Sequence, residues 1–169
     1  SDLVYLTNHN DATQYSAPRF SPDGQWILFS VFRGEDRDIA LIRADSPPLP
    51  KKHGRRDAPK GKGGRLGQLK SKADTQQVFP DSLAFPDPDT SGFRALLASR
   101  ADERDPFWLT DGSGFVFASD QTGIFNIYLY HLETGEVEQL TNVLGGAFAP
   151  SVSPSGRVVY SGYHAADYS

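Results

Sequence analysis

The sequence predicts an all-β fold, a partial β-propeller of about two and a half four-stranded antiparallel blades interrupted by a long basic loop. One motif occurs three times: a proline, a large apolar residue two positions later, a tight turn ending in glycine, and an apolar run. The leading prolines are 88 and 44 residues apart, so one separation is twice the other. A period of roughly 40–45 residues with four short strands per unit is typical of a propeller blade. The copies are Pro18–Gly24, Pro106–Gly112 and Pro150–Gly156.

The tight turn of each copy predicts a strand that returns antiparallel to the one before it. In the first copy, Pro22 presets φ at the second turn position, Asp23 suits the third, and Gly24 takes the left-handed conformation. The apolar run that follows, Trp26–Phe29, indicates a strand covered on both faces by neighbouring sheets. The corresponding turn residues of the other copies are Asp111, Gly112, Pro154 and Gly156.

The turn Phe20–Gly24 and the strand after it resemble the repeat of TolB-type, WD-repeat-like propellers. The same repeat occurs in the propeller domains of prolyl-oligopeptidase-like peptidases. Residues 120–130 and the ending Gln139–Asn142 resemble the later part of that repeat, and the resemblance extends over residues 1–42 and 93–169. It implies the fold, whereas function has to be argued from individual residues because one fold hosts many functions.

The repeat divides residues 1–169, as one partial propeller, into successive blades. The expected units are the outer strand of a preceding blade at 1–10, blade one at 17–99 with an insertion at about 43–92, blade two at 105–142, and a truncated blade three at 149–169. An alternative takes Phe85–Asp87 as a worn fourth copy, but no room then remains before Pro106 for two further strands. Because propellers close with roughly four to eight blades, both ends of this arc should present unpaired strand edges. Those edges would pair with other protein chains or with missing blades of the same protein.

One stretch of the chain carries most of its positive charge. Residues 43–72 hold ten of the seventeen lysines and arginines and only two aspartates, a net charge of +8 in a chain whose total is −4. They also hold five glycines and a cluster of three prolines with almost no large apolar residue, so we expect a long loop that cannot fold alone. Its candidate partner-binding residues are Lys51, Lys52, Arg55, Arg56, Lys60, Lys62 and Arg65.

Two interpretations of the basic loop compete. In one it is an arm for an anionic membrane surface or an acidic protein face, to which each basic residue contributes on the order of 1 kcal/mol. In the other, which we favour, it is a solvated insertion, since long insertions cost little entropy. Nucleic acid is the least favoured partner, because the loop lacks the interleaved aromatic residues that stack on bases.

The sequence predicts no catalytic constellation, no cofactor site and no metal site. It contains no Gly-x-Ser-x-Gly nucleophile motif and no cysteine, and no two of its four histidines stand at metal-ligand spacing. Residues Asp87–Gly92 have a faint likeness to a calcium-binding loop but are better explained as a proline-rich turn. We interpret four other acidic residues as turn carboxylates: Asp36, Asp38, Asp102 and Asp105.

Binding is instead expected at the loops of one propeller face. The segments expected there are 33–36, 120–123 and 163–166, together with the connections 99–105 and 142–148. The basic insertion and the proline-glycine turns belong to the opposite face.

Three functions remain open. The favoured one is a non-catalytic interaction or scaffold module, TolB-like and part of a larger assembly. The second is the propeller domain of a serine peptidase whose catalytic domain lies outside this chain. The third is a processed remnant that serves as an extrinsic subunit of a membrane-protein complex. The resemblance implies export to the periplasm, with a location that could be peripheral to a membrane.

Overall fold

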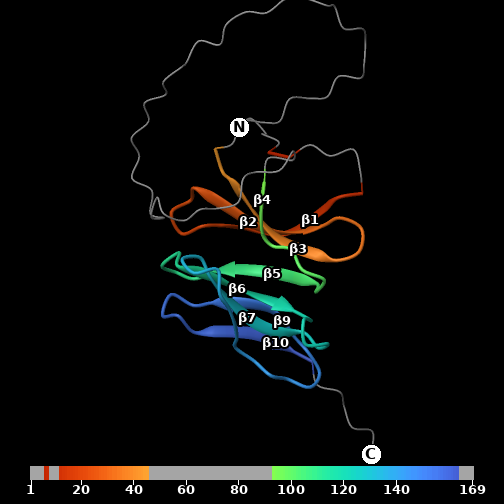
Figure 1. Cartoon of the computed structure of the whole chain (residues 1–169). Coiled ribbons are helices and arrows are strands. Elements are labelled where there is room, and N and C mark those ends of the chain that lie inside the picture. The colour runs from red at the N-terminus through yellow and green to blue at the C-terminus, as the bar shows by residue number, and fades with distance from the viewer. Residues whose placement is uncertain (1–5, 8–11, 46–92, 164–169) are drawn as a thin grey trace, which may run out of the picture.

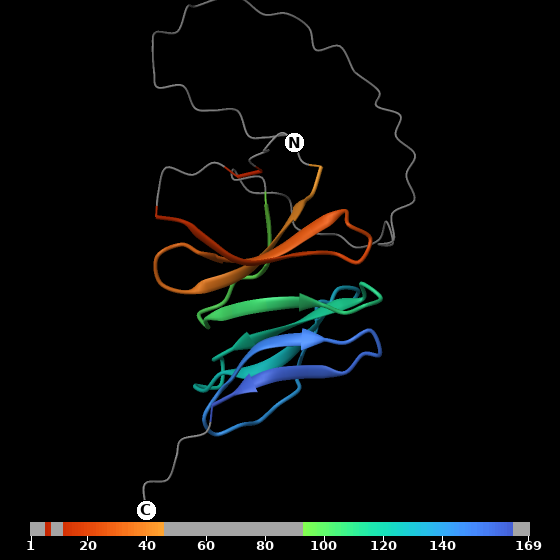
Figure 2. The same ribbon diagram turned by 180° about the vertical axis from the view of Figure 1, so that it is seen from behind.

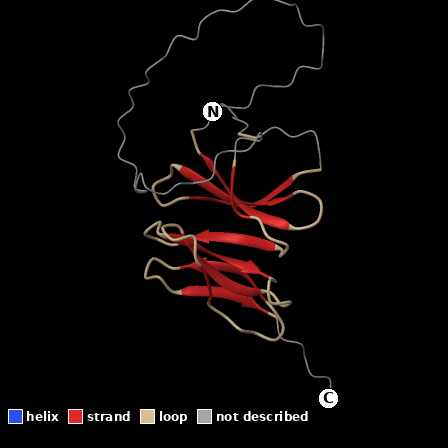
Figure 3. Ribbon diagram, in the orientation of Figure 1, coloured by secondary structure: helices blue, strands red, loops and turns tan. Residues whose placement is uncertain are grey.

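The computed structural model describes residues 6–7, 12–45 and 93–163. All regular structure in these residues is β-strand (Figure 3), arranged in three antiparallel sheets that follow one another as a stack (Figures 1 and 2). The first blade contains β1 (Gln14–Phe20), β2 (Trp26–Phe32), β3 (Arg37–Arg43) and β4 (Arg94–Leu97). The second contains β5 (Glu103–Trp108), β6 (Gly114–Ser119), β7 (Asn126–His131) and β8 (Val137–Gln139). The third contains β9 (Ala147–Val152) and β10 (Val158–Gly162). The prediction of an all-β partial propeller is confirmed.

The first blade forms although a long insertion separates its third and fourth strands. β3 and β4 pair antiparallel, with Leu41 opposite Arg94 and Ile39 opposite Leu97. The expected outer strand at 1–10 lies mostly outside the described residues, and of it Leu6 packs against the first blade. The insertion from residue 46 to residue 92 and the end of the chain from residue 164 also lie outside them.

Each inner strand breaks register at the residue before the repeated proline. Ala17, Asp105 and Ala149 have φ values of 51°, 56° and 48°, in the left-handed region that non-glycine residues seldom adopt. The register of β1, β5 and β9 against the neighbouring strand shifts at these same positions. The repeated proline therefore marks a β-bulge in all three blades. This geometry is unexpected from sequence, because a residue before proline ordinarily prefers the extended region.

Alternating side chains of the strands form the contacts between blades. Leu28 and Leu41 of the first blade face the second, whereas Val31 and Ile42 face the opposite side. This alternation is the period-two pattern of a strand buried on both faces. The cluster between the first two blades, which we call the first seam, consists of Trp26, Leu28, Ile39, Leu41, Trp108, Phe115, Phe117, Tyr128 and Leu132. The indole Nε1–H of Trp108 also donates to the Arg19 carbonyl oxygen across this seam, at 3.2 Å.

The third blade packs on the second through a smaller cluster, the second seam. Val116, Ala118 and Ile127 of the second blade contact Ala147 and Val152 of β9. Within the described residues β10 pairs only with β9, and Val159 and Tyr160 of β10 are largely exposed. The described part of the third blade therefore presents an unpaired edge, as the sequence predicts for an arc.

Candidate interaction surface

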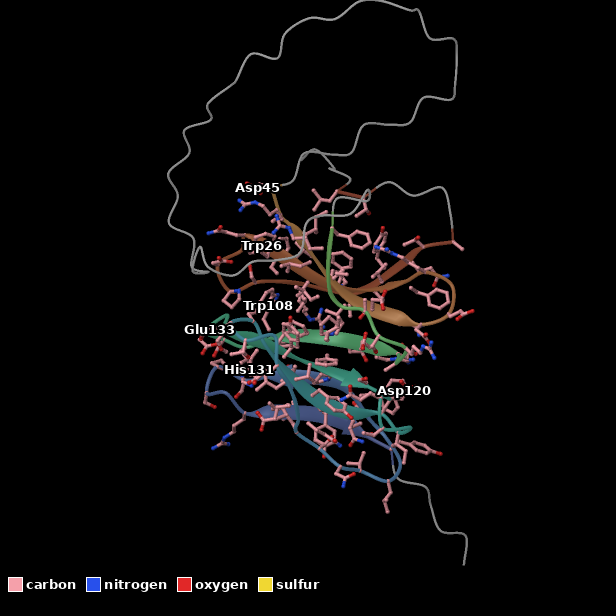
Figure 4. All side chains as sticks on the ribbon, viewed as in Figure 1. Trp26, Asp45, Trp108, Asp120, His131 and Glu133 are labelled. Atoms are coloured by element: carbon pink, nitrogen blue, oxygen red, sulfur yellow. The ribbon has the colours of Figure 1, made fainter. Side chains whose placement is uncertain are left out.

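The connections between strands gather at the two opposite ends of the strands, on opposite sides of the stack of blades. Figure 4 places Asp120 at one end and Asp45 and Glu133 at the other. We call the end near Asp120 the loop surface and define it as residues 33–36, 98–102, 120–125 and 140–146, the connections from β2 to β3, β4 to β5, β6 to β7 and β8 to β9. Segment 163–166 was expected to join this surface; Tyr163 donates its N–H to the Gly146 carbonyl oxygen at 2.9 Å, and residues 164–166 lie outside the described residues.

Asp102 links the loops of the first two blades. Its carboxylate accepts from Arg37 at 3.1 Å and also pairs with Arg104. Its backbone N–H donates to the Asp120 carboxylate at 2.8 Å. Because these partners come from β3, from β5 and from the end of β6, three connections are held in one arrangement. An exposed ion pair contributes little to stability, so the value of this network lies in fixing loop positions.

Two further carboxyl groups lie beneath the loop surface: Glu103 at the start of β5 at the first seam, and Asp38 near the start of β3 on the opposite face of the first blade. Burial raises the pKa of Glu103 to about 7, against the lowering effect of the Ser99 hydrogen bond, and the negative charges of Asp38 and Asp102 add to the rise. Burial also raises the pKa of Asp38, an effect that Arg33 opposes. Asp38 and Asp105 were expected in turns, and this expectation is wrong, because they lie within β3 and β5.

A neutral polar side chain, Asn126, is buried at the start of β7. Its Oδ1 accepts from the Thr141 hydroxyl at 3.0 Å and from the Val143 N–H at 2.9 Å. Its Nδ2 donates to the Ile124 carbonyl oxygen at 3.2 Å. One amide thereby anchors the connection from β8 to β9 against β7.

An open groove of about 400 Å³ lies beside this anchored connection. Thr122 and Ile124 line it from the connection between β6 and β7, and residues 139–144 line it from the end of β8 onward. Leu144 is 94% exposed at its border. The groove has no charged lining residue, so it adds a neutral, partly apolar strip to the loop surface.

The predicted turn residues lie at the opposite end. Gly24, Gly112 and Gly156 have φ values of 74°, 72° and 79°. Each donates its N–H to the carbonyl oxygen three residues earlier, at 2.8, 3.1 and 2.9 Å. Pro22 and Asp23, Asp111, and Pro154 occupy the turns that these bonds close.

The predicted partner-binding residues of the basic loop lie outside the described residues: Lys51, Lys52, Arg55, Arg56, Lys60, Lys62 and Arg65. The turn expected at 87–92 does as well. Within the described residues, no cluster of three or more His, Asp or Glu side chains could hold a metal ion. The same residues include no helix that is both long and apolar enough to cross a membrane.

The buried polar groups of the first seam were not predicted from the sequence. Glu103 lies two residues before the bulge residue Asp105 of β5, at the repeat position that Ala147 occupies in β9. A charged residue at a buried repeat position is a signal that alignment of the repeats around Pro106 and Pro150 would have exposed.

Comparisons with known proteins agree with this fold. No protein-family model matches the sequence. The chain is 24% identical over 153 residues to the uncharacterized protein Atu1656 of Agrobacterium fabrum, covering 86% of this chain and 50% of that protein. It is 35% identical over 54 residues to the Tol-Pal system protein TolB of Francisella tularensis, covering 32% of this chain and 12% of that protein. The chain thus spans about half the length of the first relative and less of the second.

Two solved structures share the arrangement of the blades. TolB from Acinetobacter baumannii matches 90% of this chain over 27% of its own, with a TM-score of 0.51 and 19% identity. A puromycin-hydrolyzing peptidase of Mycobacterium tuberculosis matches 87% of this chain over 18% of its own, with a TM-score of 0.51 and 13% identity. At these identities the likeness concerns fold, and it agrees with the repeat seen in the sequence. The described residues therefore form an arc of a β-propeller whose fold is similar to that of TolB, with two four-stranded blades and two strands of a third.

Proposed function

We propose that this chain is a non-catalytic protein-interaction module that binds a partner protein through its loop surface, within a larger assembly at the cell envelope. The observation that carries this proposal is the link through Asp102, which fixes connections of two blades in one arrangement. Loops fixed before binding lose less conformational entropy when a partner docks. The likeness to TolB supports the envelope location, because one relative is named as a protein of the Tol-Pal system.

The loop surface offers both charge and apolar contact. Glu35 and Arg100 are exposed on it, and the neutral groove continues it toward Leu144. Charges of both signs beside an apolar strip favour a protein partner, whose interface has a polar rim around an apolar centre.

Site-specific photo-crosslinking tests this proposal. A photoreactive residue at Gln121, exposed on the loop surface, is compared with one at Thr134, exposed at the opposite end. We expect a discrete crosslinked product from Gln121 and none from Thr134 in cells that express the protein. Equal products from both positions, or none from either, would contradict the proposal. Fractionation of the same cells tests the location, which is wrong if the protein stays with the cytoplasmic fraction.

The second candidate function is that of a propeller domain in a serine peptidase whose catalytic domain lies outside this chain. The likeness to a puromycin-hydrolyzing peptidase supports it. In that case the gene that encodes this chain also encodes a Gly-x-Ser-x-Gly motif, and the loop surface would face the catalytic domain. Sequencing the gene on both sides of this region decides between the two candidates.

Binding of the basic loop to an anionic surface remains a prediction, which a vesicle-binding experiment tests. If it is an anionic-surface arm, replacing Lys51, Lys52, Arg55 and Arg56 with glutamate weakens binding to vesicles that contain phosphatidylserine. Unchanged binding at low salt would leave the solvated insertion as the explanation.

A further inference from the structure

We propose that Glu103 is a proton-dependent switch in the first seam, which keeps the loop surface ordered while its carboxyl group is protonated and loosens it when the carboxylate forms. The switch is a property of the seam itself. Its consequence for partner binding rests on the function proposed above.

Glu103 is buried with too few hydrogen-bond donors for a carboxylate. Its side chain is 3% exposed, at the start of β5 and opposite Ser119 of β6. Oε1 accepts from the Ser99 hydroxyl at 2.6 Å, and Oε2 has no hydrogen-bond partner among the described residues. An ionised carboxylate can accept about four hydrogen bonds. Within the part of the chain that the structure describes, its donors come from Ser99 alone, through the hydroxyl and the backbone, and burying a carboxylate with so few donors is costly. The neutral acid is the form that this site accommodates.

The charges around Glu103 also oppose its ionisation. Asp38 of β3 and Asp102 of the β4–β5 connection both add to the rise of its pKa. The neighbouring cations Arg37 and Arg104 both pair with Asp102, and the buried Nε of Arg104 has no hydrogen-bond partner among the described residues.

The other elements packed on β5 supply no compensating cation. Arg33 lies over the Phe93 ring, 4.4 Å from its centre, and acts on Asp38. β2 and β9 contain no ionisable residue. Arg19 of β1 lies over Phe107, four residues further along β5. On β6, Ser119 is neutral, and Asp120 after it is a further anion.

The second seam shows what the same position looks like without a switch. Glu103 precedes the bulge residue Asp105 by two positions, and Ala147 precedes Ala149 by two. The first seam thus has a carboxyl group at the repeat position where the second seam has the methyl group of Ala147.

The stability of the full chain as a function of pH tests the switch. Because the pKa of Glu103 is raised from 4.5 to about 7 in the folded protein, its stabilising contribution is present at low pH and is lost as pH rises through that window. Between about pH 5 and about pH 8 we expect the folding equilibrium constant of the wild type to fall by on the order of 50- to 100-fold more than that of Glu103→Gln. Glu133→Gln, at an exposed glutamate, should follow the wild type. Parallel curves for wild type and Glu103→Gln would overturn the proposal.

A measurement on the wild-type protein covers the case in which Glu103→Gln fails to fold. The carbon-13 resonance of the Glu103 carboxyl group should titrate near neutral pH, and a midpoint at the ordinary value of a glutamate overturns the switch. Amide exchange of Asp102, whose N–H donates to Asp120, should accelerate above that midpoint beyond its intrinsic pH dependence; unchanged protection also overturns it. Crosslinking from Gln121 that weakens above the midpoint shows regulation of binding. Absence of crosslinking at every pH refutes the proposed function and leaves the switch to be decided by the first two measurements.

Discussion

Two neighbouring glycines of the second blade are required for different physical reasons. Gly112 has a φ of 72° at the turn after β5. Residues with a side chain seldom adopt this left-handed conformation. Gly114 has no such φ, but a Cβ placed there would collide with the carbonyl oxygen of Tyr130 on the paired strand β7. A backbone atom in a ladder cannot move aside as the end of a side chain can. The sequence shows a glycine pair, and only the structure separates the two causes.

We therefore predict that Gly114→Ala is the more damaging substitution. It should lower the free energy of unfolding by about 2–3 kcal/mol, because it forces β6 and β7 apart. Gly112→Ala should cost about 1–2 kcal/mol, and Gly112→Asn less, since asparagine tolerates the left-handed region. Urea denaturation of the three variants measures these differences. Equal losses for Gly114→Ala and Gly112→Asn would contradict the collision.

Burial of charge is the residue-scale property that the sequence concealed. Asp38 and Glu103 are far apart in the chain, and packing of one blade on the next brings them near enough for the charge of Asp38 to raise the pKa of Glu103. The sequence placed Asp38 in a turn and gave no sign that Glu103 is buried, since acidic residues are seldom buried. The glycines of the turns were predictable because the conformation of a turn depends on residues adjacent in sequence. The contacts of a seam depend on residues that are far apart in sequence.

At the scale of the element, the inner strands share a bulge whose backbone is bonded across blades. The Asp105 N–H donates to the Ser30 hydroxyl of the first blade at 3.2 Å, and the Asp105 carboxylate accepts from the Ala149 N–H of the third at 3.3 Å. A left-handed non-glycine residue costs about 1–2 kcal/mol, which these contacts help to offset. The strands could be predicted from their apolar runs and turns, but the bulges could not, because proline argues for an extended residue before it.

The bulge geometry leads to a prediction for Ala149, which is exposed and has a φ of 48°. Ala149→Gly should leave the free energy of unfolding unchanged within about 0.5 kcal/mol or raise it, because relief of the left-handed strain offsets the added freedom of the unfolded chain. Ala147→Gly, two residues earlier and buried in an ordinary strand conformation, should cost about 1 kcal/mol. Thermal unfolding compares them. A larger loss for Ala149→Gly than for Ala147→Gly would refute this account.

At the scale of the whole molecule, blades are joined chiefly through apolar seams between sheets. Both tryptophans of the chain, Trp26 and Trp108, lie in the first seam, so intrinsic fluorescence reports on that contact. The stacking of blades follows from strands that are apolar on both faces, and this much was predictable. The size of the space that each seam side chain fills depends on the residues of the facing blade. It therefore cannot be predicted from the sequence of one blade alone.

Leu41 and Ile42 test the two faces of the first blade. Leu41→Ala leaves a cavity in the first seam and Ile42→Ala leaves one on the opposite side, and each should cost about 2–5 kcal/mol. In Leu41→Ala the tryptophan fluorescence should change at lower urea than the far-ultraviolet circular dichroism, because the blades separate before the sheets melt. In Ile42→Ala the two transitions should coincide. Coincident transitions in both variants would mean that the blades unfold as one unit.

The shared bulge also defines a natural cassette. From Pro106 to the residue before Pro150 the chain spans one full repeat of 44 residues, and it begins and ends at the same kinked backbone geometry. A gene fusion that inserts a second copy of this cassette after Ala149 would meet matched ends on both sides. The arc could then be lengthened by one repeat at a time, with the connection between blades that the protein already has.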